Sequence, residues 1–171
     1  MLSTTPLQDI ATIIFIGLGA TAVMDTWLAL LKRAGIQAGS LALVGRWVGH
    51  FRHVRFAHVA IGKSPPIPGE HLLGWITHYV VGVAFSGLLI AFVGLTWTSN
   101  PTLTPALAVG ISTVAAPLLI MQPAMGLGLA ASRTQTPVKN CLRSLANHAV
   151  FGVGLYWSAC FAASLVEWIS R

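Results

Sequence analysis

Residues 65–95 read PPIPGEHLLGWITHYVVGVAFSGLLIAFVGL, a proline-rich run that leads directly into a long apolar segment. The prolines disfavour a helix in the first part, whereas residues 70–95 are long and apolar enough to form a helix that crosses a membrane. That helix would carry Glu70 in its first turn and His78 two turns deeper. The stretch therefore predicts a membrane span with ionisable groups inside it.

The composition places the whole chain in a membrane. Of its 171 residues, 55% are hydrophobic and only 8% are charged, whereas about a quarter of the residues in an average soluble domain are charged. Besides residues 70–95, the apolar segments 7–31, 103–132 and 144–169 are long enough to span a bilayer. We therefore predict an all-α, polytopic membrane protein in which four transmembrane helices form one membrane domain over residues 1–171.

Two segments depart from the simple pattern of apolar spans and polar turns. Within the connection 32–69, residues 41–55 follow helical spacing with polar residues on the other side, which predicts an amphipathic helix in the membrane interface. Its basic face would lie on anionic lipid headgroups. In the third span, Pro117 and Pro123 predict a helix that is kinked or broken near Met121.

Lysine and arginine are distributed unevenly among the connections. Six lie in residues 32–63, three in residues 133–143 and none in the turn 96–102. Basic residues collect on the cytoplasmic side of membrane spans. We therefore predict a multi-pass protein of the bacterial inner membrane, with cytoplasmic loops at 32–69 and 133–143 and with both termini in the periplasm.

The formal net charge of +6 raises the question of a nucleic-acid partner. Basic residues that flank membrane spans explain this charge, and no basic stripe with interleaved aromatic residues forms a soluble module. We therefore expect no nucleic-acid binding, and we expect the lipid bilayer to be the main partner.

Ionisable and polar side chains concentrate in the cytoplasmic half of the predicted bundle. At a rise of about 1.5 Å per residue, Asp25 lies about 10 Å from Lys32 along its helix, and His78 lies about 12 Å from Glu70. Side chains at similar depths on antiparallel helices can meet. The predicted polar cluster consists of Asp25, Glu70, His78, Gln122, Met125 and His148.

One interpretation of this cluster is a haem or transition-metal site linked to redox chemistry or metal handling. His78 and His148 lie on different predicted helices, as the two ligands of a haem can do. Histidine with methionine suits copper, and histidine with carboxylates suits iron or zinc. Under this interpretation His78 and His148 are the metal ligands.

A second interpretation is proton-coupled transport of a small molecule or ion. Asp25 or Glu70 would carry the proton, the histidines would relay it, and the broken third helix would move or line the path. Because four helices are few to enclose a path, this reading implies a homo-oligomer. A third interpretation is an accessory or structural subunit of a membrane complex. No nucleophile and base form a recognisable pair, so no catalytic residue is assigned.

Five motifs are spaced along nearly the whole chain, at residues 19–27 (GATAVMDTW), 45–50 (GRWVGH), 68–79 (PGEHLLGWITHY), 121–134 (MQPAMGLGLAASRT) and 144–156 (SLANHAVFGVGLY). Together they resemble a bacterial family of small integral membrane proteins, the domain of unknown function 2938. The resemblance implies a four-helix inner-membrane protein without an established activity. It also draws Arg46 and His50 toward the site, which would require the interfacial helix to fold back and cap the polar cluster.

Overall fold

The computed structural model describes residues 5–36 and 39–169, and every regular element within these ranges is helical. Four helical segments are long and apolar enough to cross a membrane. They are Pro6–Arg33, Glu70–Val93, Leu103–Ala124 and Pro137–Ile169. The predicted all-helical fold with four potential transmembrane helices is confirmed.

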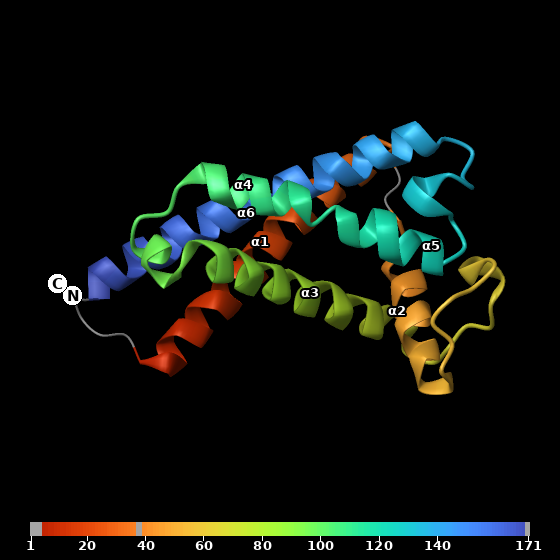
Figure 1. Ribbon diagram of the computed structural model, residues 1–171, viewed down its shortest axis with the longest axis horizontal. Helices are drawn as coiled ribbons and strands as arrows, with labels where there is room; N and C mark the ends of the chain where they lie inside the picture. Colours follow the sequence, from red (N-terminus) through yellow and green to blue (C-terminus); the bar gives the residue numbers. More distant parts are fainter. Residues whose placement is uncertain (1–4, 37–38, 170–171) are drawn as a thin grey trace.

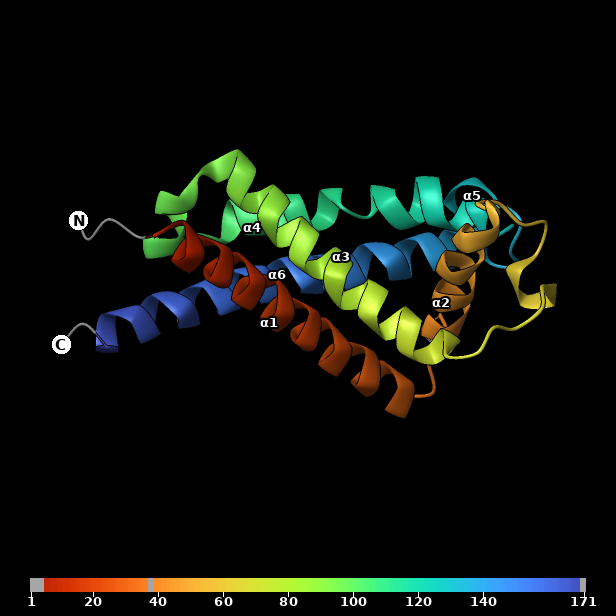
Figure 2. The same ribbon diagram turned by 90° about the horizontal axis from the view of Figure 1, so that it is seen from below.

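The long helices lie roughly along one axis, with the start of α1 and the end of α6 at one end and α2 at the other (Figures 1 and 2). Helix α1 (Pro6–Arg33) contacts α3 (Glu70–Val93) and α6 (Pro137–Ile169), and α6 also contacts α4 (Leu103–Ser112). Their shared core contains Ile16, Ala20, Leu89, Phe151, Leu155 and Ala159. The segments 32–63 and 133–143, which carry most of the basic residues, lie at the same end of the molecule, opposite the turn between α3 and α4.

The third span is interrupted. Helix α4 ends at Ser112, and a π-helical segment (Ala116–Met121) leads into the single turn α5 (Gln122–Ala124). Pro117 and Pro123 have no N–H to donate, so the regular ladder of helical hydrogen bonds cannot continue through them. The interruption starts before the predicted position near Met121.

The boundaries of the last two spans also differ from the sequence-based expectation. The third span ends at Ala124 rather than near residue 132, because Gly126 and Gly128 have positive φ angles that turn the chain. A 3₁₀ turn, Leu129–Ala131, follows. Helix α6 then starts at Pro137, before the expected start at residue 144.

The predicted interfacial helix exists as α2 (Leu41–Gly49), but it packs across the start of α3. The two backbones approach closely where Gly45 faces Gly74. A Cβ atom at Gly45 would overlap the carbonyl oxygen of Glu70, and a Cβ atom at Gly74 would overlap that of Leu41. Helix α2 is therefore a packed part of the bundle end and does not lie on lipid alone.

This contact makes the glycines necessary for the packing of α2. We expect Gly45→Ala or Gly74→Ala to force α2 away from α3 and to destabilise the protein by about 1–3 kcal/mol, the usual cost of overpacking. The measurement is thermal unfolding in detergent, followed by circular dichroism. Gly62→Ala is the matched control, because a Cβ atom there meets nothing within 4 Å. Equal melting temperatures for the Gly45→Ala and Gly62→Ala proteins would contradict the described contact.

Candidate functional site

A cavity of about 320 Å³ opens between the membrane helices. We call it the His78–His148 cavity, after the two histidines that line it. Its remaining lining is mostly apolar, with two threonines, Thr21 and Thr77, and two methionines, Met24 and Met121. Sites for drug-sized ligands usually measure about 300–1,000 Å³, so this volume suits a small organic molecule.

On one side of the cavity, Asp25 holds His78 by a hydrogen bond between α1 and α3. Nε2 of His78 donates to Oδ1 of Asp25 at 2.9 Å, and the hydroxyl of Tyr79 donates to Oδ2 at 2.9 Å. Because both oxygens of the carboxylate act as acceptors, the imidazole carries its proton on Nε2. The neutral ring of His78 therefore keeps a lone pair on Nδ1.

The second histidine is oriented by a threonine of the interrupted third span. The hydroxyl of Thr113 donates to the carbonyl of Gly110 at 2.6 Å, so its oxygen is left to accept from Nδ1 of His148 at 2.9 Å. The proton of the neutral ring is therefore on Nδ1. His148 keeps its lone pair on Nε2.

The two histidines that line this largely apolar cavity thus each keep one ring nitrogen with a lone pair. Such nitrogens accept hydrogen bonds or a proton, and they also bind metal ions. The carboxylate of Asp25 behind His78 would compensate the positive charge that this ring gains on taking a proton. Within residues 5–36 and 39–169, no three His, Cys, Asp or Glu side chains are grouped so that they could hold a metal ion.

The structure brings together only part of the predicted polar cluster. Asp25, His78 and His148 lie at or directly behind the cavity wall, whereas Glu70, Gln122 and Met125 do not line the cavity. Gln122 and Met125 are buried elsewhere, and Oε1 of Gln122 has no hydrogen-bond partner within the described residues.

Glu70 instead binds Arg46, the residue predicted to cap the cluster. Nε and Nη2 of Arg46 each donate to a different carboxylate oxygen of Glu70 at 2.8 Å, and the backbone N–H of Ile67 donates to the same carboxylate at 3.1 Å. The hydrogen bonds with Glu70 raise the pKa of Arg46. The predicted cap residues therefore lie outside the cavity, while Leu41, Val44 and Trp47 of α2 do line it.

Sequence reasoning did not assign Tyr79 or Thr113 to the site, although these two side chains orient the histidines and their carboxylate. A signal exists for both. Tyr79 directly follows His78, and Thr113 is one of the few hydroxyl side chains inside the apolar third span. Met24 likewise precedes Asp25 and lines the cavity. Residues beside an ionisable residue, and hydroxyl side chains inside an apolar span, therefore mark this site in the sequence.

A second pair of histidines lies outside the membrane spans. Nδ1 of His50 and Nε2 of His58 are 2.8 Å apart, and their rings are stacked with centroids 4.9 Å apart. His50 is buried. Burial lowers the pKa of His58, and electrostatic interaction with His50 and Arg55 lowers it further. The pair is therefore favoured when His58 is neutral.

This arrangement predicts a loss of stability in acid. In the unfolded chain, His58 takes up a proton at about pH 6.5. In the folded protein it takes up the proton only at lower pH, because its pKa is lowered. The stability that neutral His58 contributes is thus present above the unfolded pKa and is lost as the pH falls below it. We expect the melting temperature to fall between about pH 7 and about pH 5, and to fall less in His58→Gln.

The control for this experiment is His71→Gln, which removes an exposed histidine. It should keep the pH dependence of the original protein. If His58→Gln and the original protein show the same dependence, the described burial of His58 is wrong.

Comparison with known proteins identifies a family but no activity. Neither a curated protein nor a solved structure matches the chain. One family model does match, over residues 14–162, and this range contains Asp25, His78 and His148. The chain therefore belongs to the family described as protein of unknown function DUF2938.

Proposed function

We propose that this protein binds a small, lipid-soluble molecule in the His78–His148 cavity and exchanges a proton with it. Such an exchange is the central step of proton-coupled transport. The observation that carries the proposal is the pair of oriented imidazoles in one apolar cavity of about 320 Å³. The ligand would be largely apolar and would bear at least one hydroxyl or N–H group that donates a hydrogen bond.

The hydrogen bonds around the two rings support this ligand chemistry. Nδ1 of His78 and Nε2 of His148 carry lone pairs, so a ligand has to donate to them. A donor that reaches an acceptor in apolar surroundings gains more than it would in water. His78 is the proton acceptor in this proposal, because Asp25 is in place to balance the charge.

The interrupted third span supports a role in transport. Ala116, Pro117, Ile120 and Met121 line the cavity, and all four belong to the π-helical segment. Many transporters build their binding sites from discontinuous helices, and π-helical turns are frequent at functional sites. A change in this segment would alter the cavity wall directly.

The proposal includes an orientation and an assembly. Residues 32–63 and 133–143, at the α2 end, hold nine of the ten lysines and arginines, which favours the cytoplasm of a bacterial inner membrane for this end and the periplasm for both termini. Because four helices are few to surround a transport path, the transporting unit would be a homo-oligomer.

Two probes of similar shape test the binding proposal. 4-Nitrophenol can donate a hydrogen bond and has a yellow phenolate form, whereas 4-nitroanisole lacks the hydroxyl proton. We expect the detergent-purified protein to bind 4-nitrophenol about five- to tenfold more tightly, since a net hydrogen bond contributes about 1 kcal/mol. His78→Phe combined with His148→Phe should remove this difference. Equal binding of the two probes to the original protein would refute the ligand chemistry.

The absorbance of bound 4-nitrophenol tests the proton exchange. Asp25→Asn should reduce the yellow fraction, shifting the equilibrium by roughly tenfold, because a hydrogen bond to a charged group contributes about 1.5–3 kcal/mol. Asp9→Asn is the control, since it removes a carboxylate from the other end of the same helix. An unchanged yellow fraction in Asp25→Asn would exclude Asp25 from the exchange.

A bound copper(I) ion is the second candidate, because Met24 and Met121 line the same cavity as the two histidines. Thioether and imidazole ligands together suit copper(I). Under this candidate the purified protein binds one equivalent of copper(I), and Met24→Leu combined with Met121→Leu abolishes binding. Met125→Leu, a buried methionine outside the cavity, should retain it. A visible absorption spectrum of the same samples would detect bound haem. Protein that contains neither copper nor haem would refute the interpretation of the cavity as a metal or haem site.

A further inference from the structure

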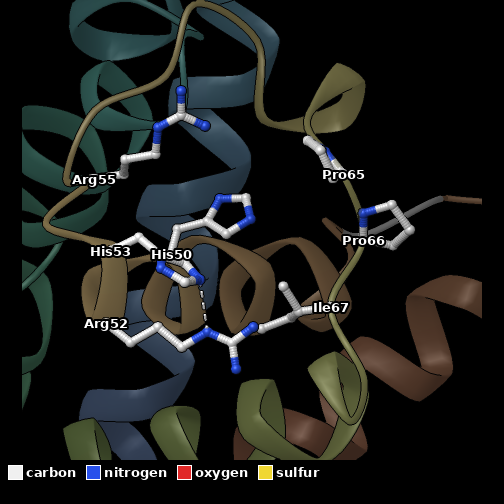
Figure 3. Close-up of a pocket in the computed structure, with 7 residues that line it drawn as sticks. All are labelled: His50, Arg52, His53, Arg55, Pro65, Pro66 and Ile67. Atoms are coloured by element: carbon white, nitrogen blue, oxygen red, sulfur yellow. Dashed lines mark hydrogen bonds between the residues drawn. The ribbon is translucent and has the colours of Figure 1, made fainter.

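A second cavity, of about 420 Å³, opens at the bundle end that carries the basic loops. We call it the basic pocket. One wall is the 3₁₀ turn His50–His53 together with Arg55, and the other is the non-helical segment 65–67. In Figure 3, the side chains of His50 and Arg52 extend from the first wall toward Pro66 and Ile67 on the second. The basic pocket shares no lining residue with the His78–His148 cavity.

The lining of the basic pocket is positively charged. Four of its seven residues are arginine or histidine, and none is acidic. The whole chain has four carboxylate side chains. Glu70 is bound to Arg46, and the other three belong to α1 and α6. Arg52 and Arg55 therefore have no carboxylate partner within the described residues.

Several side chains of the pocket are held in place by hydrogen bonds. Nε of Arg52 donates to Nε2 of His53 at 3.0 Å, as the dashed line in Figure 3 shows. Nε2 of His53 is thus an acceptor, so the ring is neutral with its proton on Nδ1. The terminal amino groups of Arg52 are left to bind a ligand. His50, which also lines the pocket, is buried, and its ring is held in place by the hydrogen bond to His58.

An ordinary solvated basic surface would explain arginines without partners. It would not explain a hollow in which Nε of Arg52 is already held by His53, and such preorganisation lowers the entropy cost of binding. A planar guanidinium group binds two oxygens of a phosphate at once, which makes arginine the preferred residue for this anion. The lining also contains no carboxylate that would repel an anion.

We propose that the basic pocket binds a phosphate group, with Arg52 and Arg55 as charged donors and Nδ1–H of His53 as a neutral donor. The phosphate can belong to an anionic lipid headgroup or to a free phosphate compound. The lipid is the favoured source, because Val54 and Phe56, on either side of Arg55 in the sequence, are exposed and apolar, as residues that contact acyl chains are. Basic pockets beside membrane helices bind such headgroups.

The test uses the full chain in nanodiscs of neutral phosphatidylcholine. Two probes, short-chain phosphatidic acid and inorganic phosphate, are titrated separately by calorimetry. Arg52→Gln combined with Arg55→Gln should weaken binding of the phosphate by about tenfold or more, since each arginine contributes charged hydrogen bonds. Arg133→Gln combined with Lys139→Gln is the matched control. It removes the same charge from exposed positions at the same end and should change the affinity less than about twofold.

The two probes identify the source of the phosphate. Binding of phosphatidic acid alone indicates a headgroup site, and similar binding of both probes indicates a site for free phosphate compounds. Each of these outcomes supports the proposal. Absence of binding to both probes, or an equal loss of affinity in the two double variants, overturns it.

A conservative variant covers the case in which the glutamine variant does not fold. Arg52→Lys combined with Arg55→Lys keeps both charges but cannot bind two phosphate oxygens with one planar group. We expect this variant to bind the phosphate several-fold more weakly than the original protein, with unchanged circular dichroism. Unchanged affinity in this variant would contradict the assigned role of the guanidinium groups.

Discussion

The hydrogen bonds of Asp25 impose the constraint on which the membrane region depends. A charged side chain inside a membrane span costs at least about 2.5 kcal/mol unless protein or water satisfies it. Asp25 meets this requirement by accepting from His78 and Tyr79, both on α3. The pairing fixes the depth and rotation of α3 against α1. It also orients the ring of His78 where that ring lines the His78–His148 cavity.

The ion pair of Arg46 and Glu70 has a corresponding effect at the end of the bundle. Besides its two hydrogen bonds to Glu70, Arg46 donates to the carbonyl of Ser64 at 3.0 Å. One guanidinium group thus joins α2, the start of α3 and the loop between them. Since α2 forms part of the cavity wall and the loop forms part of the basic pocket, both proposed sites depend on this contact.

The four spans could be predicted from the sequence, because length and hydropathy determine which segments can cross a bilayer. The interruption of the third span was also signalled, by Pro117 and Pro123. Its position depends on how the neighbouring helices satisfy the freed carbonyl groups, which no local pattern specifies. For the same reason the contact between Thr113 and His148 could not be predicted.

The polar cluster was predictable only in part. Depth along a helix follows from residue counts, so Asp25 and His78 could be expected at similar levels, and in the structure they are hydrogen-bonded. The partner of Glu70 was not predictable, because it comes from α2. The amphipathic pattern of that helix specifies an apolar side but not the direction from which it approaches α3. The close passage of Gly45 past Gly74 determines that direction.

The most direct test of this account is nitrogen-15 NMR of the histidine-labelled protein, with His78→Gln and His148→Gln used to assign the signals. We predict opposite tautomers for the neutral forms of the two rings. The proton should be on Nε2 in His78, where Asp25 accepts it, and on Nδ1 in His148, where Thr113 accepts it. The same tautomer in both neutral rings would contradict the hydrogen bonds to Asp25 and Thr113.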